Sequence, residues 1–188
     1  MNDERDAGTQ RARGRAEDAG AGQAPRIARF AVLFLLLSVG LTLAASTPPA
    51  TRLVHEPLQR GVARIAMWIL APFGESHVRG ASLDYKNFGV EIVEACDGVL
   101  PSIIFLAAVL AFPSRWRDKA LGALIGLPSI FAINLVRVVT LMFVGAARPE
   151  IFEQVHIYVW QAIVIACAMG LWVFWAERFV RPRAARRP

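Results

Sequence analysis

Four apolar stretches, separated by charged or proline-containing segments, constrain the fold of this chain most strongly. They cover residues 27–45, 99–112, 120–144 and 155–176. A transmembrane helix needs about 20 mainly apolar residues to cross a hydrocarbon core of about 30 Å. Hydrophobic residues make up 55% of the 188-residue chain, which is high for a water-soluble domain. The pattern predicts an all-α polytopic membrane protein with about four transmembrane helices.

The basic residues predict the orientation of these helices. Fourteen of the 21 Lys and Arg fall in residues 1–30, 114–119 and 177–188, which lie on one side of a four-span chain. Positive charge is retained in the cytoplasm, so we predict that both termini and the 114–119 loop are cytoplasmic. Because the positive charge gathers in short tracts beside apolar runs, we predict contact with the lipid bilayer and no binding of nucleic acid.

The N-terminal part divides into a tail and a helix. Residues 1–25 contain hardly any bulky apolar side chain, so we predict a disordered cytoplasmic tail, followed by one transmembrane domain over residues 26–188. A cleaved signal peptide is the alternative for residues 27–45, because positive charge precedes the run and small residues follow Leu43. The length of the run favours a retained helix.

Two elements are predicted between the first and second apolar stretches. Residues 58–73 carry apolar side chains at helical spacing with Arg60 and Arg64 on the other face, which predicts an amphipathic helix in the outer membrane interface, a depth suited to Trp68. Residues 77–93 show a partly two-residue rhythm, which predicts a short extended segment or hairpin outside the membrane.

Three chemically versatile side chains fall at the extracytoplasmic ends of the spans in this topology. Cys96 begins the second span, Arg137 lies toward the end of the third and His156 begins the fourth. A thiol, a guanidinium and an imidazole in one cavity would suit acyl transfer. We expect residues 95–98 to form the first turn of the second helix, where free N–H groups would lower the pKa of the thiol and hold an oxyanion. The nearby negative charges of Glu94 and Asp97 act in the opposite direction and disfavour a thiolate.

Three further residues are candidates for supporting roles. Asn134 shares a helical face with Arg137 and is predicted to orient the guanidinium or to donate to substrate. Gly98 would permit close backbone approach, and Trp160 lies near His156. One Cys and one His without suitably spaced carboxylates make a weak zinc site, so no metal and no cofactor is predicted.

Each of these residues also has a purely structural interpretation. Cys96 alone would most often be a packing residue, as we predict for Cys167, which is placed too far away for a disulfide with it. Arg137 alone could extend to the lipid headgroups, and His156 could belong to an interfacial aromatic belt with Trp160. Their joint occurrence on one side of the membrane favours a common site.

Four motifs together resemble a known family. They are A-C-D-G at 95–98, A-F-P-S-R-W-R at 111–117, N-L-V-R at 134–137 and F-E-Q-V-H-I-Y-V-W-Q at 152–161. This set is similar to the exosortase/archaeosortase family, most of all to the short bacterial form exosortase H. The similarity covers the last hundred residues well and residues 80–92 loosely. It departs from larger members in having about four spans rather than about eight, and in Asp97, Leu100 and Pro101.

The resemblance implies a membrane-embedded cysteine protease or transpeptidase in the inner membrane of a bacterium, with its active site facing the extracytoplasmic side. Cys96, Arg137 and His156 would be its catalytic residues. Its partners would be exported proteins whose C-terminal sorting signal combines a short motif, a transmembrane helix and a basic cluster, with an IPTL-type tail suspected. A thioester would pass the protein to an acceptor.

Two other functions remain alternatives. A membrane transporter or assembly scaffold without catalytic activity would use Arg137 as an anion site. A thiol–disulfide oxidoreductase ranks lower, because the chain lacks a C-x-x-C pair.

Overall fold

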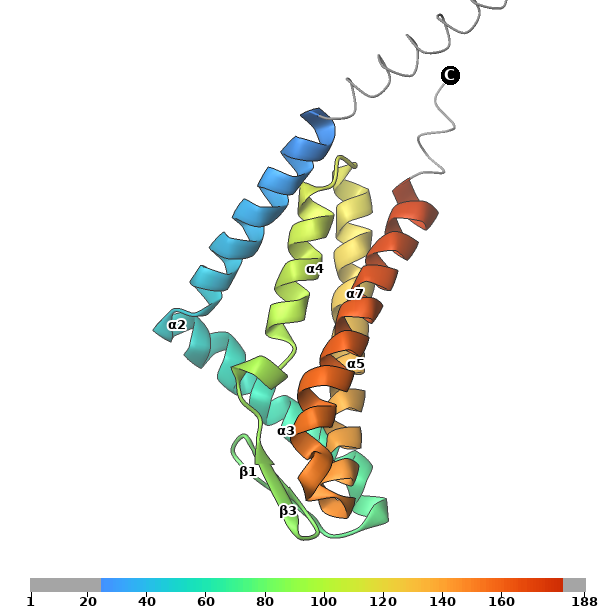
Figure 1. Cartoon of the computed structure of the whole chain (residues 1–188). Coiled ribbons are helices and arrows are strands. Elements are labelled where there is room, and N and C mark those ends of the chain that lie inside the picture. The colour runs from blue at the N-terminus through green and yellow to red at the C-terminus, as the bar shows by residue number, and fades with distance from the viewer. Residues whose placement is uncertain (1–24, 181–188) are drawn as a thin grey trace, which may run out of the picture.

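The computed structural model describes residues 25–180 (Figure 1). The predicted disordered tail therefore lies, apart from Pro25, outside the described residues. The described part is mainly helical, with one small sheet at one end (Figure 1). This confirms the predicted all-α polytopic class.

Three of the described helices are long and apolar enough to cross a membrane. They are Pro25–Ala45, α5 (Trp116–Ala147) and the C-terminal helix Pro149–Val180. A fourth apolar helix, α4 (Val99–Ala111), is shorter. It covers only about 20 Å at 1.5 Å per residue, less than the hydrocarbon core. The four apolar stretches of the sequence thus correspond to three full-length helices and one short helix.

The C-terminal helix is continuous in direction but irregular in its hydrogen bonding. A 3₁₀ turn over Pro149–Ile151 begins it, and Pro149 suits the first turn because that position needs no N–H donor. The rest of the helix consists of α6 (Phe152–Gln154), a π-helical segment (Val155–Trp160), α7 (Gln161–Trp175) and a second π-helical segment (Ala176–Val180).

The arrangement of the helix ends agrees with the predicted alternation of sides. The start of the first helix, the connection between α4 and α5 and the end of the C-terminal helix lie at one end of the molecule, while the sheet lies at the other (Figure 1). Arg26, Arg29, Arg115, Arg117, Lys119 and Arg178 therefore gather at one end, as the charge pattern predicts, although Arg148 follows α5 at the sheet end.

The predicted amphipathic helix is present and slightly displaced. α2 (Pro48–Ala50), a π-helical segment (Thr51–His55) and α3 (Glu56–Leu70) follow one another directly, and a 3₁₀ turn (Ala71–Phe73) ends the run. One face of α3 is buried through Val62, Ala63, Ala66 and Leu70, whereas Trp68 is 68% exposed. An exposed Trp on the opposite face is compatible with an interfacial position.

The predicted extended segment is a three-stranded antiparallel sheet. β1 (Ser76–Arg79), β2 (Ser82–Tyr85) and β3 (Phe88–Glu91) pair in sequence order. Two-residue connections join them, and Gly80 and Lys86 adopt positive φ there, at 67° and 55°. Tight hairpin connections need this left-handed conformation. Leu83 and Tyr85 alternate with half-buried residues and are themselves buried, so one face of β2 is the inner face.

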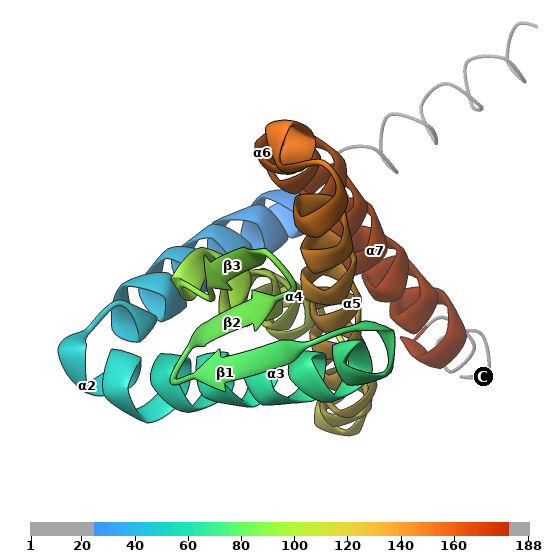
Figure 2. The same cartoon turned by 90° about the horizontal axis from the view of Figure 1, so that it is seen from below.

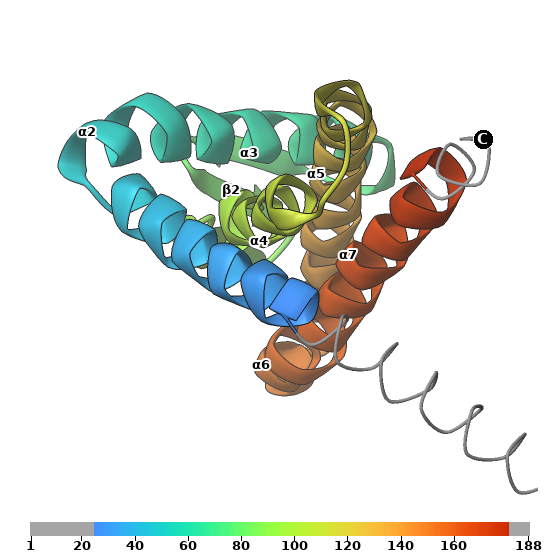
Figure 3. The same ribbon diagram turned by 90° about the horizontal axis from the view of Figure 1, so that it is seen from above.

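Two clusters of buried apolar side chains hold the elements together. The first, here called the sheet-side core, joins α3, β2 and the second half of α5, with Cys96 packed against it. The second, the helix-end cluster, joins α4, α5 and the end of the C-terminal helix. Figure 2 shows the sheet lying over α3, and Figure 3 shows α4 between the first helix and α5. Central members of the sheet-side core are Ala63, Leu70, Leu83, Tyr85 and Met142; those of the helix-end cluster are Phe105, Val109, Ile130 and Trp175.

Candidate functional site

Cys96 and His156 contact each other although they are 60 positions apart in sequence. Cys96 ends a 3₁₀ turn (Glu94–Cys96) that connects the sheet to α4, and His156 lies in the π-helical segment before α7. The Cys96 Sγ and the His156 Nε2 are 3.1 Å apart, within hydrogen-bond distance for sulfur. The structure therefore places a thiol and an imidazole in direct contact, an arrangement that is compatible with covalent catalysis by a thiol.

Arg137 completes the group from α5. Its side chain is only 5% exposed, so it is buried within the protein. Its positive charge acts on the Cys96 thiol and favours the thiolate. Among the residues that the structure describes, the Nε of Arg137 has no hydrogen-bond partner. A buried guanidinium with a free donor is suited to an anionic or strongly polarised group of a ligand.

Asn134 holds the backbone of the nucleophile. It is 1% exposed, and its Nδ2 donates a hydrogen bond of 2.7 Å to the carbonyl oxygen of Cys96. The sequence predicted that Asn134 would orient Arg137 or donate to substrate, but in the structure its amide N–H group fixes the cysteine main chain. The side-chain oxygen of Asn134 has no hydrogen-bond partner within residues 25–180.

The prediction that residues 95–98 form the first turn of the second helix is wrong, because of the backbone conformation of Gly98. Its φ of 86° is left-handed, and α4 begins only at Val99. A left-handed residue ends the 3₁₀ turn and redirects the chain, so Cys96 precedes the helix instead of joining it. A Cβ at Gly98 would lie 3.3 Å from the Asn134 Cγ, which shows that the glycine permits the close approach of α5.

A buried His–Asp pair supports the same turn, and sequence reasoning missed it. The Nδ1 of His55, from the π-helical segment before α3, contacts the Oδ2 of Asp97. The Oδ1 of Asp97 accepts a hydrogen bond of 2.9 Å from the backbone N–H of Val99. His55 is 5% exposed and Asp97 is fully buried. The pair therefore ties the start of α4, and with it the nucleophile, to the helix that carries the sheet-side core.

Only part of this pair had a signal in the sequence. An Asp two residues before the first turn of an apolar helix is a recognisable capping residue, so Asp97 could have been assigned to the helix start. His55 lies 42 positions earlier in a segment without a motif, and nothing in its surroundings predicted its partner.

The electrostatic environment of the thiol combines opposing effects. Burial raises the pKa of the Cys96 thiol, the Arg137 guanidinium lowers this pKa, and the Asp97 carboxylate raises it. The net effect is a pKa above the ordinary value, so the opposing effect expected of Asp97 is present and the lowering expected from a helix N-terminus does not prevail. A thiol with a raised pKa is mainly protonated at neutral pH, and the imidazole of His156 lies within contact distance of it.

Aromatic rings position the imidazole from the sheet side. The ring of Phe152 stacks on the ring of His156 with centroids 5.8 Å apart, and Phe88 of β3 packs on Phe152 at 4.9 Å. The sheet thus fixes the orientation of the base through two rings. Trp160, predicted as a supporting residue, is half-buried in the same π-helical segment, but the next residue, Gln161, is the one that lines the adjacent cavity.

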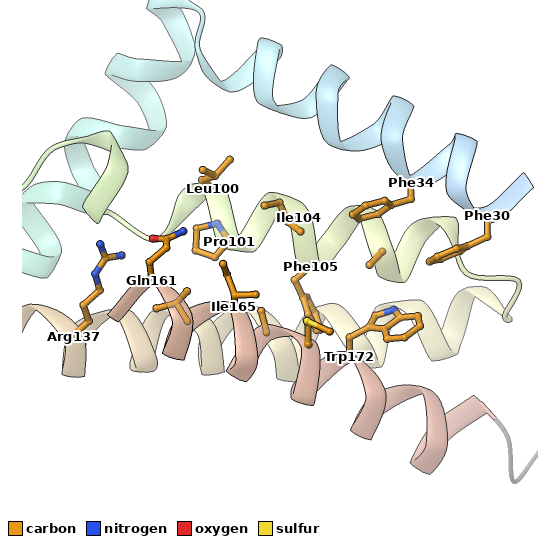
Figure 4. Close-up of a pocket in the computed structure, with 14 residues that line it drawn as sticks. Phe30, Phe34, Leu100, Pro101, Ile104, Phe105, Arg137, Gln161, Ile165 and Trp172 are labelled. Atoms are coloured by element: carbon orange, nitrogen blue, oxygen red, sulfur yellow. The ribbon is translucent and has the colours of Figure 1, made fainter. Parts of the chain in front are cut away.

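An elongated cavity of about 480 Å³ begins beside this site and runs between the helices. Figure 4 shows Arg137 and Gln161 at one end, Phe30 and Trp172 at the other. Neither Cys96 nor His156 lines it, so of the three predicted catalytic residues only the guanidinium is shared by the cavity and the Cys–His pair. Between the two ends the wall is apolar and comes from the first helix, α4 and α7, with Phe34, Leu100, Pro101, Ile104, Phe105, Ala108, Val164, Ile165, Ala168 and Met169.

The two cysteines differ in their surroundings. Cys96 and Cys167 are both free, half-buried thiols, but Cys96 contacts His156, whereas Cys167 lies within α7.

Over residues 25–180, no group of three or more His, Cys, Asp or Glu side chains is arranged to hold a metal ion.

Comparison with known proteins identifies a family. A model of the family described as transmembrane exosortase matches residues 20–176, which include every residue of the site. Neither the search of curated proteins nor that of solved structures gives a match.

Proposed function

Because the chain belongs to the transmembrane exosortase family, we propose that it is a cysteine transpeptidase that cleaves the C-terminal sorting signal of exported proteins. In this proposal Cys96 is the nucleophile, His156 the general acid and base, and Arg137 the group that stabilises the oxyanion. The observation that carries the proposal is the 3.1 Å contact between the Cys96 Sγ and the His156 Nε2 beside a buried guanidinium.

The first half of the reaction would form a thioester. As the scissile carbonyl arrives, His156 takes the proton of the thiol and the Cys96 sulfur attacks the carbonyl carbon. Negative charge then develops on the carbonyl oxygen, where the fixed positive charge of Arg137 stabilises it in a partly desolvated site. The tetrahedral intermediate collapses when the C–N bond breaks, and His156 returns its proton to the leaving amine.

The second half would release the protein from the enzyme. An amine or hydroxyl acceptor, or water, gives a proton to His156 and attacks the thioester carbonyl. A second tetrahedral intermediate forms at the same guanidinium and expels the Cys96 thiolate, which takes the proton back from His156. Asn134 keeps the Cys96 backbone in place throughout, so it acts as a positioning residue.

The experiment that tests the proposal is co-expression with an exported protein that carries a sorting motif, a transmembrane helix and a basic cluster. The wild-type chain is expected to shorten this substrate, and hydroxylamine is expected to release it from a covalent adduct with the chain. Cys96→Ala and Cys96→Ser should abolish both signals at unchanged protein level, with Cys167→Ala as the matched control that keeps both.

The opposite result would favour a different function. If Cys96→Ala retained the biological activity while Arg137→Ala lost it, the cysteine would not be a nucleophile. The chain would then be a membrane anion-binding scaffold or transporter.

We further propose that the site faces the extracytoplasmic side of a bacterial inner membrane, because the sheet lies opposite the helix ends that carry the basic residues (Figure 1). In a variant without native cysteines, Arg79→Cys in β1 should react with an impermeant maleimide from outside the cell. Trp116→Cys, at the opposite end of the molecule, should react only after the membrane is opened. The reverse labelling pattern would invert the topology.

A further inference from the structure

The cavity beside the site has a composition that the proposed chemistry does not explain. One end carries the buried Arg137 guanidinium with its free Nε, next to the Gln161 amide, and the rest of the wall is apolar. A ligand that fits both parts has a charged or polar head and a hydrocarbon body. Figure 4 shows Arg137 and Gln161 at one end of the cavity, and apolar side chains along the rest of it up to Phe30 and Trp172.

The location of the cavity indicates how such a ligand would enter. Two of its walls are the first helix and α7, which belong to the two candidate spans with the least burial in the structure, 0% and 6%. Helices of this kind face lipid, so the space between them opens toward the bilayer. The ligand is therefore expected to come from the membrane.

The size of the cavity favours a hydrocarbon chain over a helix. A helix about 10–12 Å wide fills a cross-section of about 100 Å², so 480 Å³ would hold roughly one helical turn. The lining residues of α7 run from Gln161 to Trp172, about 16 Å along the helix axis at 1.5 Å per residue. One lipid leaflet contributes about half of the 30 Å hydrocarbon core, which is nearly the same depth.

Aromatic rings close the end that lies away from Arg137. The ring centroid of Phe30 lies 6.1 Å from that of Phe112 and 6.0 Å from that of Trp172. These contacts attach the first helix to α4 and α7 at that end. A chain that enters with its head at Arg137 would thus end against a wall of rings.

We infer that this cavity binds one hydrocarbon chain of an anionic membrane lipid whose headgroup pairs with Arg137. The guanidinium has five N–H donors, so it can hold a phosphate oxygen through some of them and leave others for the reacting carbonyl. The headgroup then lies beside the Cys–His pair, where the acceptor of the thioester also has to approach. The binding itself does not depend on the proposed cysteine chemistry.

The test uses the purified full-length chain in nanodiscs, with phosphatidylglycerol or phosphatidylcholine that carry identical acyl chains. A photoreactive group on the acyl chain is expected to crosslink to α4 and α7 residues of the cavity wall, at least about fivefold more from phosphatidylglycerol. Arg137→Gln should remove this headgroup preference. Cys96→Ala should keep it, which separates the failure of this inference from the failure of the proposed function.

A variant that fills the cavity, with a matched control, tests whether the hydrocarbon chain of the lipid lies inside the cavity. Ala168→Phe puts a ring into the cavity wall and should reduce crosslinking at least tenfold, whereas Ala166→Phe, at an exposed position of the same helix, should not change it. Ala108→Leu repeats the test from α4 if Ala168→Phe fails to fold.

Three outcomes would overturn the inference. They are equal crosslinking from the two lipids, unchanged crosslinking in folded filling variants, and displacement of the lipid by a synthetic apolar helix with a basic tail. The last result would assign the cavity to the transmembrane helix of a protein substrate.

Discussion

The two ends of the molecule differ in how much of their apolar surface is buried. At the sheet end, α3, the sheet and the second half of α5 bury a continuous apolar core, and polar groups such as His55 and Asp97 are buried and paired. Toward the other end, the first helix and the C-terminal helix leave most of their apolar surface open, and a cavity remains between them. Cys96 lies where the two meet, with the sheet-side core on one side and the cavity near Arg137 on the other.

The proposed reaction makes two demands on the site, and each end of the molecule suits one of them. A thiol and an imidazole have to keep a fixed distance, which dense packing provides. A reactant that arrives from the bilayer needs an opening, which loosely associated helices provide. The comparison predicts that substitutions of buried residues at the sheet end change stability or the properties of the thiol, while matched substitutions at exposed positions, including those of the two open helices, change little.

The largest expected effect concerns the buried His–Asp pair. His55→Ala would leave the Asp97 carboxylate buried without its partner and should lower the free energy of unfolding by about 3–5 kcal/mol. Arg60→Ala removes an exposed ion pair with Glu56 on the same stretch of helix and should lower it by less than about 1 kcal/mol. Unfolding titrations with SDS in mixed micelles measure both. Equal small losses would show that the sheet end is not tightly packed around this pair.

The second effect compares two glycines in membrane helices. Gly145 of α5 faces the ring of Phe88, and an added Cβ would meet the ring at 2.1 Å, whereas Gly170 of α7 has open space. Gly145→Ala should therefore cost about 1–3 kcal/mol of stability through overpacking. Gly170→Ala should be neutral or stabilising by up to about 1 kcal/mol, because Ala favours the helix. Thermal unfolding in detergent measures the stability of both variants. Equal shifts of their unfolding temperatures would show that the two positions are packed alike.

The third effect concerns the thiol. The Asp97 carboxylate raises the pKa of Cys96, so Asp97→Asn should lower this pKa and speed alkylation by iodoacetamide at pH values below it. Glu94→Gln, two residues before Cys96, is the control and should leave the pH profile unchanged. Both are measured in a Cys167→Ala background. A profile that moves to higher pH in Asp97→Asn would contradict the assigned sign.

The smallest effect concerns the orientation of the imidazole. Phe152→Leu removes the ring that stacks on His156 and should slow substrate processing about two- to tenfold, corresponding to about 0.5–1.5 kcal/mol for an aromatic contact. Phe174→Leu removes a ring pair with Phe179 at the far end and should leave the rate unchanged. A rate loss of the same size in both variants would mean that His156 is not positioned from the sheet side.

The membrane helices could be predicted from the sequence because their signal is local. Length, apolar composition and flanking charge are properties of each segment, so residues 27–45 and 120–144 were placed within a few positions of the observed helices. The same topology brought Cys96 and His156 to one end, where the structure shows them in contact. Their catalytic role stays a prediction.

Asn134 and Gly98 were predicted as supporting residues, but the contacts they make could not be predicted, because these contacts join distant segments. His55 meets Asp97 only after α3 has packed beside the start of α4. The role of Asn134 depends on the close approach of α5 that the left-handed Gly98 allows. The cavity lies between the first helix, α4 and α7, and the arrangement of these helices cannot be predicted from hydropathy. Local chemistry thus indicated the candidate site residues, whereas packing determines their geometry.

The anchoring of the turn that carries Cys96 has a consequence for turnover. The carbonyl of this residue is held by Asn134, and the next residue is tied to His55. These contacts restrain the backbone on both sides of the sulfur, so rotation about the side-chain bonds of Cys96 is its main freedom of movement. In the proposed reaction, donor and recipient would then have to meet one nearly stationary atom in succession, and the first cleavage fragment would have to leave before the second partner enters.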